Sequence, residues 1–261
     1  MHFMVKRVTL ITGASSGIGA ELARIFASNG YNTVLVARRD DRLKLLADEI
    51  TAAGHPRPAL ITSDLCAAGA CEQIAAELKA MDVEVDTVVN NAGYGLFGEA
   101  LELDREQQLA MVDLNVRVLT DLTLRFADSL VRHRGGILNV ASIASFLPGP
   151  RMAVYCATKA YVLSFTEAMR GELGPKGVRV TALCPGPVPT EFQGVAGFNP
   201  GLDSAVLNVS AAAVARAGYR GLMSNKRLVL PGVGVRMIPF MLRFAPRSLV
   251  LASVARVQQK R

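Results

Sequence analysis

The chain has 261 residues, a formal net charge of +7 and 51% hydrophobic residues, with no tryptophan. This length fits one α/β domain with a sizeable core, and no linker interrupts it. The four cysteines, Cys66, Cys71, Cys156 and Cys184, have neither zinc-ribbon spacing nor that of a paired extracellular framework, so we expect reduced thiols and no metal site. The positive charge favours anionic ligands, but no basic stripe or aromatic platform predicts nucleic-acid binding.

The N-terminal residues 1–7 lack the hydrophobic region of a signal peptide. A cytoplasmic location is therefore predicted.

Short apolar runs alternate with helical patterns along the chain. The runs lie near residues 8–11, 33–37, 59–62, 85–89, 137–141, 178–183 and 227–230. Near-continuous apolar strands separated by helices are typical of a parallel sheet that is covered on both faces. We therefore predict a doubly wound, Rossmann-like sheet of seven parallel strands in a single domain.

A glycine-rich turn follows the first run. Its sequence is Thr-Gly-Ala-Ser-Ser-Gly-Ile-Gly over residues 12–19, and an apolar helical pattern begins at once after it. Free backbone N–H groups at such a helix start bind pyrophosphate, and glycine lets the phosphates approach the backbone. The alternative is a tight turn in which Ser16 caps the helix. The candidate nucleotide contacts are Gly13, Ser15, Ser16, Gly17, Ile18 and Gly19.

The second run ends about twenty residues after this turn, where a site for NAD usually has an acidic residue. Here Ala37 is followed by Arg38 and Arg39. A guanidinium can pair with a ribose 2′-phosphate, which predicts NADP(H), with Arg38 as the preferred ligand. The alternative is that both arginines begin a solvated helix, which leaves NAD(H) possible as the cofactor.

Tyr155 and Lys159 are four residues apart, and Ser142 precedes them just after the fifth run. On a helix this spacing places the phenol and the ammonium on one face. A tyrosine has an unperturbed pKa of ~10, so a nearby cation would favour its ionised form. The alternative is an exposed amphipathic pair that arises by chance.

Together these patterns closely resemble the short-chain dehydrogenase/reductase family. The turn matches the family's Thr-Gly-x-x-x-Gly-x-Gly, and the Tyr-x-x-x-Lys pair matches its catalytic helix. The resemblance covers about residues 5 to 232 and includes Asp64, residues 90–93, Asn115 and residues 185–190. It implies one domain over residues 1–232, with a substrate loop at about 188–210, that transfers hydride between a nicotinamide and a carbonyl or alcohol.

The resemblance assigns four catalytic residues. Tyr155 would protonate the forming alkoxide, and Ser142 would hold the carbonyl. Lys159 would lower the pKa of Tyr155 and bind the nicotinamide ribose. Asn115 would position a water that reloads the proton through Lys159, although the residues alone favour a polar side chain satisfied inside a helix.

The resemblance also implies further cofactor contacts. Asp64 would accept a bond from the adenine amino group beside the Leu65 amide, with an acidic helix cap as the alternative. The others are Asn91, Ala92 and Gly93 near the adenosine, Tyr155 and Lys159 at the ribose, Pro185 and Gly186 below the nicotinamide, and Val188 and Thr190 at the carboxamide.

Apolar residues surround the expected substrate site. Phe192, with Val195, Phe198 and Leu202, follows the last cofactor segment, and Phe146, Leu147 and Met152 lie near the catalytic residues. They predict a hydrophobic ketone, aldehyde or secondary alcohol as substrate, with Ser142, Tyr155, Phe146 and Phe192 as its contacts. The alternative is that these residues pack a loop against the core.

Residues 233–261 form a basic, amphipathic C-terminal extension beyond the resembling part. Its apolar runs are too short to span a bilayer, and Pro239 and Pro246 interrupt it. It could lie on an anionic membrane surface as a weak peripheral contact, cover the substrate cleft, or pack on a second subunit. We favour the last two, and the resemblance implies a homodimer or homotetramer.

The primary hypothesis is an NADP(H)-dependent oxidoreductase acting on a small hydrophobic carbonyl or alcohol. The alternatives are an NAD-preferring alcohol dehydrogenase and a non-catalytic NADP-sensing protein, which would have no chemical reason to keep the complete catalytic set.

Overall fold

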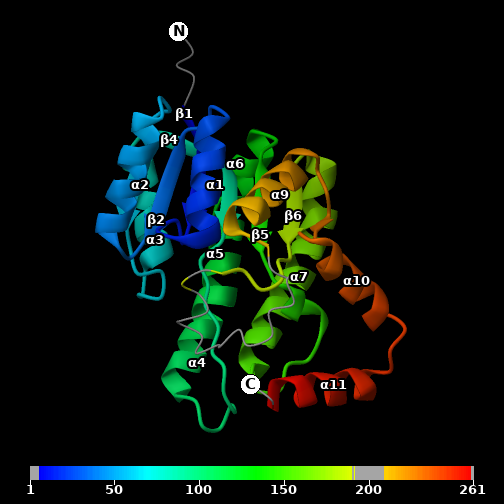
Figure 1. Ribbon diagram of the computed structural model, residues 1–261. Coiled ribbons are helices and arrows are strands. Elements are labelled where there is room, and N and C mark those ends of the chain that lie inside the picture. Colours follow the sequence, from blue (N-terminus) through cyan, green and yellow to red (C-terminus); the bar gives the residue numbers. More distant parts are fainter. Residues whose placement is uncertain (1–5, 190, 192–208, 260–261) are drawn as a thin grey trace.

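The computed structural model describes residues 6–189, 191 and 209–259. These residues form one seven-stranded sheet in which all neighbouring strands are parallel, in the order β3-β2-β1-β4-β5-β6-β7 (Figure 1). The strands are β1 (Lys6–Thr12), β2 (Thr33–Ala37), β3 (Ala59–Thr62), β4 (Val83–Asn90), β5 (Gly136–Val140), β6 (Arg179–Leu183) and β7 (Leu228–Val229). The predicted doubly wound parallel sheet is confirmed.

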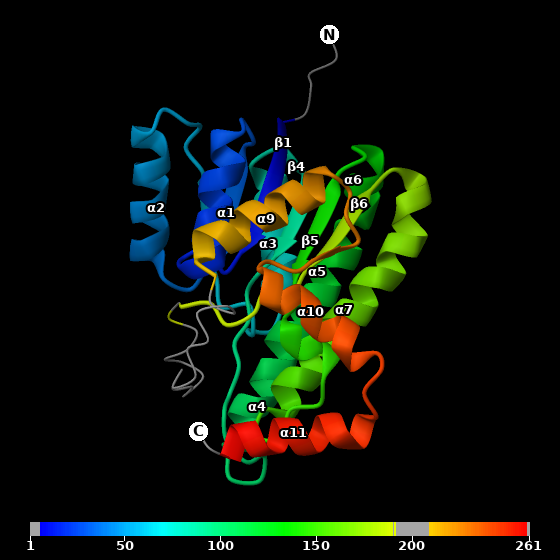
Figure 2. The same cartoon turned by 45° about the vertical axis from the view of Figure 1, so that its right-hand side comes forward.

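Helices connect the strands and cover both faces of the sheet (Figure 2). They are α1 (Gly17–Ser28), α2 (Asp40–Ala52), α3 (Ala70–Ala80), α4 (Arg105–Val112), α5 (Leu119–Arg125), α6 (Ala127–Arg132), α7 (Ala153–Leu173), α9 (Ala211–Met223), α10 (Val233–Leu242) and α11 (Arg247–Gln259). A π-helical turn, η1 (Asp113–Val118), joins α4 to α5, and two short 3₁₀ turns are η2 (Ile143–Phe146) and η3 (Gly174–Lys176).

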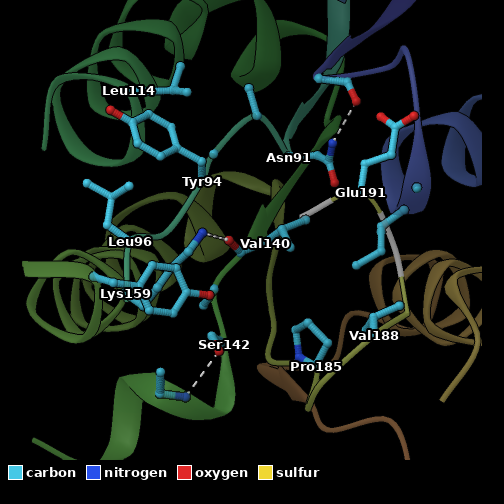
Figure 3. Close-up of a pocket in the computed structure, with 18 of the residues that line it drawn as sticks. Asn91, Tyr94, Leu96, Leu114, Val140, Ser142, Lys159, Pro185, Val188 and Glu191 are labelled. Carbon is cyan, nitrogen blue, oxygen red and sulfur yellow. Dashed lines mark hydrogen bonds between the residues drawn. The ribbon is translucent and has the colours of Figure 1, made fainter. Parts of the chain in front are cut away.

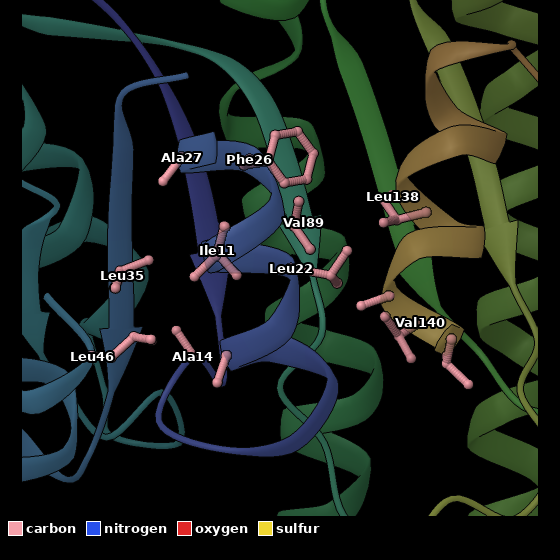
Figure 4. Close-up of a cluster of buried hydrophobic side chains, with 14 of the residues drawn as sticks. Ile11, Ala14, Leu22, Phe26, Ala27, Leu35, Leu46, Val89, Leu138 and Val140 are labelled. Atoms are coloured by element: carbon pink, nitrogen blue, oxygen red, sulfur yellow. The ribbon is translucent and has the colours of Figure 1, made fainter. Parts of the chain in front are cut away.

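Two large apolar clusters sandwich the sheet. Successive residues of β1 point to opposite faces, so that Ile11 packs with α1, α2 and α9, whereas Leu10 packs with α3, α5, α6 and α7. Figure 4 shows the first cluster, in which Leu22 and Phe26 of α1 lie between Ile11 and Leu138. Because both faces are covered, β2 and β5 are buried along their whole length, and their sequences are apolar rather than alternating.

The strand order reverses between β1 and β4. The chain runs outward from β1 through β2 to β3, and then returns to place β4 on the other side of β1. Ligands of such sheets bind at this reversal, beyond the carboxyl ends of the strands. The loops after β1, β4 and β5 therefore converge at one edge of the sheet.

The C-terminal helices α10 and α11 follow the last strand. Figures 1 and 2 both show α11 at the end of the molecule where the strands finish, below the first turns of α7. Arg151, in the loop before α7, donates from Nη1 to the carbonyl oxygen of Gln258 at 2.8 Å. In the described part of the chain, no helix has the length and apolar character that crossing a membrane requires.

Candidate active site

A cavity of about 790 Å³ runs along the carboxyl edge of the sheet (Figure 3). Its walls come from the turn after β1, the loops after β2 to β6, the helix α7 and the end of α11. Most of the predicted site residues line it: Gly13, Ser15, Ser16, Gly17, Ile18, Arg38, Arg39, Asp64, Leu65, Asn91, Ala92, Gly93, Ser142, Tyr155, Lys159, Pro185, Gly186 and Val188. Residues predicted from distant parts of the sequence therefore share one cavity.

The glycine turn opens one end of this cavity. Gly13 and Gly17 have φ of 64° and 56°, in the left-handed region that favours glycine. Ser16 is the N-cap residue of α1, but its side chain makes no capping hydrogen bond. The first backbone N–H groups of α1 therefore have no side-chain cap and are available to an anion, as pyrophosphate binding requires.

Gly19 does not line the cavity, although the sequence predicts it as a cofactor contact. A Cβ at this position would lie 2.3 Å from the carbonyl oxygen of Gly13 and 2.4 Å from Nδ2 of Asn91. The missing side chain therefore lets α1 pack closely against the turn.

Thr12 and Asn91 join the ends of β1 and β4. The Thr12 hydroxyl donates to the carbonyl of Val89 at 3.3 Å and accepts the backbone N–H groups of Asn91 and Ala92 at 3.0 and 3.1 Å. The Asn91 side chain donates in turn to the carbonyl oxygens of Thr12 and Gly13, at 2.9 and 3.1 Å. Asn91 thus shapes the glycine turn.

Two arginines lie at the same end of the cavity. Arg39 donates from Nη2 to the hydroxyls of Ser15 and Ser16, at 3.1 and 3.0 Å, and forms an ion pair with Glu191 at 2.8 Å. Hydrogen bonds from Arg39 and then Ser16 hold the pKa of Glu191 below its usual value. Arg38 is exposed and lines the cavity. No local pattern marks Glu191, so the sequence did not predict its contact with Arg39.

Asp64 lines the cavity and also stabilises its own loop. Its Oδ1 accepts the backbone N–H of Cys66 at 3.0 Å. The N-cap residue of α3 is Gly69, so Asp64 does not cap that helix. The predicted contact of Asp64 with an adenine amino group stays a prediction.

Ser142, Tyr155 and Lys159 lie together beyond the end of β5. Tyr155 and Lys159 are buried on one face of α7, and Nζ of Lys159 is 5.9 Å from the centre of the Tyr155 ring. Nζ donates to the carbonyl of Val140 at 2.8 Å, as Figure 3 shows. The Ser142 hydroxyl accepts the N–H of Ala144 at 3.1 Å. Tyr155 and Lys159 are therefore part of a buried polar cluster and not of an exposed amphipathic face.

Ser145 ties this cluster together, although the sequence gives no signal for it. Its hydroxyl donates to the carbonyl of Lys159 at 2.7 Å and accepts the backbone N–H of Ser142 at 3.3 Å. Ser145 therefore holds the loop of Ser142 against the helix that carries Lys159.

Burial controls the protonation of the two ionisable groups. It raises the pKa of Tyr155 to about 12, while a hydrogen bond with Ser142 acts in the opposite direction. It lowers the pKa of Lys159 to about 8. The pKa of Tyr155 therefore moves opposite to the predicted direction, because desolvation of the phenolate dominates and the ammonium bonds to a backbone carbonyl. At neutral pH Tyr155 carries its proton and can act as an acid.

Asn115 is buried in the π-helical turn η1 and does not line the cavity. Its side-chain amide donates to the carbonyl of Tyr94 at 2.9 Å and to the hydroxyl of Thr158 at 3.1 Å, and its oxygen accepts the N–H of Tyr94 at 3.2 Å. Because Thr158 precedes Lys159 on α7, Asn115 holds the loop after β4 against the helix that carries Lys159. The predicted water-holding role stays a prediction, and the side chain is satisfied as the alternative expected.

The substrate end of the cavity is mainly apolar. Tyr94, Leu96, Leu147 and Met152 line it. Phe146, a predicted substrate contact, lies outside the cavity: it is at the end of η2, and its side chain packs against the buried cluster of Leu119, Ala141, Val162, Leu163, Ala182 and Cys184. Thr190 and Phe192 are outside the described residues.

The thiol of Cys156 is buried beside Tyr155, and burial raises its pKa to about 11. The thiol is therefore protonated at neutral pH, in agreement with a packing role. The described residues contain no group of three or more side chains that could hold a metal ion.

The fold and this cavity define a class of protein. A glycine-rich turn with an uncapped helix start at the reversal of a doubly wound sheet, beside a buried Ser-Tyr-Lys cluster, is the arrangement expected of a dinucleotide-binding oxidoreductase.

Comparison with known proteins narrows the class to a family. The family model described as short chain dehydrogenase matches residues 7–197. Sulfoacetaldehyde reductase 2 of Chromohalobacter salexigens is 37% identical over 188 residues, which cover 71% of this chain and 74% of that protein. The chain belongs to the short-chain dehydrogenase/reductase family and is an enzyme that acts on CH–OH or carbonyl groups.

Solved structures agree with this assignment. A short-chain dehydrogenase from Sphingobium yanoikuyae in complex with NADPH has a TM-score of 0.83 and 31% identity, covering 93% of this chain and 94% of its own. The bulky-bulky ketone specific alcohol dehydrogenase from Comamonas testosteroni has a TM-score of 0.78 and 29% identity, covering 93% and 92%.

The buried Lys159 predicts a specific pH dependence of stability. Its pKa is about 8 in the folded protein and 10.5 in its ordinary environment, so between these values the unfolded chain binds more protons. The free energy of unfolding of the wild type, relative to Lys159→Met, should therefore rise by roughly 2 kcal/mol from pH 8 to pH 10. Urea titrations of both proteins at several pH values measure this difference. A pH-independent difference would contradict a lysine that titrates near pH 8.

Proposed function

We propose that the protein is an NADP(H)-dependent oxidoreductase that interconverts a carbonyl and a secondary alcohol on a small hydrophobic molecule. The observation that carries this proposal is a single cavity that connects the glycine turn and two arginines to Ser142, Tyr155 and Lys159. One end offers charge and backbone donors for phosphates, and the other offers a protonated phenol for chemistry.

The residues at the arginine end fit a nucleotide with a 2′-phosphate. The start of α1 has no side-chain cap. After β2 the chain has Arg38 and Arg39 at the position where NAD sites usually have a carboxylate, which would repel a 2′-phosphate. Arg39 is already paired with Glu191, which leaves Arg38 as the preferred phosphate ligand. A related structure in complex with NADPH also supports this choice of cofactor. When bound, the nicotinamide supplies or accepts the hydride.

The residues of the chain handle the proton. The pKa of Tyr155, about 12, keeps the phenol protonated at neutral pH, so it can donate to a developing alkoxide. The Ser142 hydroxyl accepts the N–H of Ala144 and hydrogen-bonds with Tyr155, so it lies beside the phenol where it can bond to the substrate oxygen. Lys159 places a second ionisable group, its ammonium, beside the phenol, and the Val140 carbonyl accepts a hydrogen bond from that ammonium. Asn115 positions the loop after β4 against this helix.

The substrate is proposed to be a bulky, mainly apolar ketone or aldehyde, or the corresponding alcohol. Leu96, Leu147 and Met152 make this end of the cavity apolar. The relative from Comamonas testosteroni, named for bulky ketones, supports the same substrate class.

Replacement of Tyr155 by Phe tests the reaction. The phenol is the proton donor, so Tyr155→Phe should lower kcat by roughly 100-fold or more. Binding of NADPH, measured by fluorescence titration, should stay within a factor of about two or three, since one hydroxyl is lost at a distance from the phosphates. Turnover of a lipophilic ketone at the wild-type rate would contradict the mechanism. Tight NADPH binding by the wild type without turnover of any ketone would favour a sensing protein.

Replacement of Arg38 by Ala tests the cofactor preference. Loss of a charge-assisted bond to the 2′-phosphate should weaken NADPH binding by about tenfold to a hundredfold, with NADH affinity unchanged. Arg42→Ala is the matched control, because it removes one exposed positive charge from the start of α2. Equal affinities of Arg38→Ala and the wild type for NADPH would support an NAD-preferring dehydrogenase.

We also propose that the enzyme is a cytoplasmic homodimer or homotetramer, with α5 and α7 in the subunit interface. Leu124 of α5 is 56% exposed, and Tyr161 of α7 lies on the same surface, where its hydroxyl is 2.9 Å from that of Thr120. Leu124→Asp should lower the mass in solution, measured by light scattering, because a buried charge in the interface is costly. An unchanged mass would exclude this interface. Cell fractionation tests the location.

The end of α10 and the turn after it carry a second exposed apolar surface. Phe240 and Phe244 are 61% and 72% exposed, with Arg243 between them in the sequence. The double variant Phe240→Ser/Phe244→Ser separates the two options for this helix. A lower mass would make α10 a subunit contact, whereas an unchanged mass with lost sedimentation on anionic vesicles would make it a weak membrane contact.

A further inference from the structure

The last helix places one polar side chain inside the cavity. Gln258, near the end of α11, lines the cavity together with Met152 and Tyr155, although about 100 residues separate it from them in the sequence. Only 8% of its surface is exposed. This residue was not predicted, because nothing in its local sequence distinguishes it from a surface glutamine.

Arg151 holds the backbone of Gln258 in place. Its guanidinium donates from Nη1 to the Gln258 carbonyl at 2.8 Å and lies over the ring of Phe97, with Cζ 4.5 Å from the ring centre. The carbonyl of Arg151 accepts the N–H of Gly98 at 2.8 Å, and its φ is +62°, a value that non-glycine residues adopt rarely. The contacts of Arg151 therefore connect α11 to the loop after β4 and to the start of α7.

The side-chain oxygen of Gln258 has no partner. Oε1 is buried, and no hydrogen bond reaches it within the described residues 6–189, 191 and 209–259. A buried amide oxygen without a donor is unfavourable, and such oxygens in proteins are nearly always satisfied. Since the side chain lines the cavity, a ligand in the cavity can supply the missing donor.

The surroundings of Gln258 indicate what kind of donor this is. Leu96, Leu147 and Met152 provide apolar walls at the same end, whereas the carboxylates that line the cavity, Asp64 and Glu191, belong to the loops at the arginine end. A neutral amide among apolar walls gives little compensation for the desolvation of an ammonium group. A hydroxyl fits better, because it can donate to Oε1 and accept from the amide nitrogen.

We propose that Gln258 is a specificity-determining substrate contact, and that the substrate is a hydrophobic ketone or aldehyde with a hydroxyl group remote from the reacting carbonyl. Tyr155 and Ser142 hold the carbonyl end, and Gln258 binds the distal hydroxyl. Arg151 is a positioning residue that acts through the backbone of Gln258. This inference rests on the proposed function and adds the polar end of the substrate to it.

The test uses pairs of ketones that differ only in a terminal hydroxyl or methyl group, over a series of chain lengths between this group and the carbonyl. For at least one chain length, the wild type should prefer the hydroxyl member by roughly tenfold or more in kcat/KM, because the methyl member leaves Oε1 of Gln258 unpaired. Gln258→Leu should abolish the preference, mainly through KM of the hydroxyl member, and leave the methyl member unchanged or improved. Arg151→Met should reduce the same preference.

The controls separate this contact from a structural effect. Leu251→Ala changes an exposed residue of α11 and should keep the preference. Gln258→Glu keeps the shape and the acceptor but adds a charge, and it should weaken binding of the methyl member more than that of the hydroxyl member. Equal losses for both members in Gln258→Leu, or a preference that survives it, would overturn the proposal.

Failure of the proposed function gives a different result. In that case the wild type would turn over neither member of any pair while it still binds NADPH, and the proposed role of Gln258 would be rejected as well. Turnover of both members at equal rates over all lengths would instead keep the proposed function and reject only the role of Gln258.

Discussion

The junction between β1 and β4 determines where everything else in the site lies. Thr12 accepts two backbone N–H groups from the loop after β4, and the Asn91 side chain returns two hydrogen bonds to the glycine turn after β1. The absence of a side chain at Gly19 lets α1 approach this junction. With these contacts, the positive end of α1 faces the same crevice as the loops after β4 and β5. The proposed phosphate site and the proposed proton-transfer site would then serve one extended ligand.

Burial sets the protonation of Tyr155 and Lys159 in the cluster with Ser142. Tyr155 and Lys159 have few charged neighbours, so loss of water is the largest effect on both groups and favours their neutral forms. A phenol that keeps its proton suits the reductive direction, in which an alkoxide must be protonated. The same burial requires that the polar groups of the cluster bond to the protein. Val140, Ser145 and Thr158 supply these bonds, and they fix α7 relative to β5 and η1.

The two ends of the cavity differ in how they are built. The arginine end consists of loops that leave the strands directly, with Arg39 clamped between two serines and Glu191. The substrate end depends on segments outside the sheet, and α11 contributes Gln258 through its bond with Arg151. On the proposed function, the loops of the sheet would hold the cofactor, while the C-terminal segment would contact the substrate. This division is expected in a fold that supports many specificities.

The sequence by itself determined the sheet, the glycine turn and the Ser142, Tyr155 and Lys159 set. The sheet and the glycine turn follow from local periodicity, whereas the set of Ser142, Tyr155 and Lys159 follows from their spacing together with the resemblance to the family. Tertiary structure decided what depends on contacts between distant residues. The side chain of Phe146 packs against a buried cluster, and Arg39 forms an ion pair with Glu191. Asn115 finds its hydrogen-bond partners within the protein, and Gln258 lines the substrate end of the cavity. The pKa of Tyr155 also shifts in the direction opposite to the one expected. The reason is that desolvation depends on all the atoms packed around the phenol, whereas the i,i+4 spacing reveals only one neighbour, Lys159.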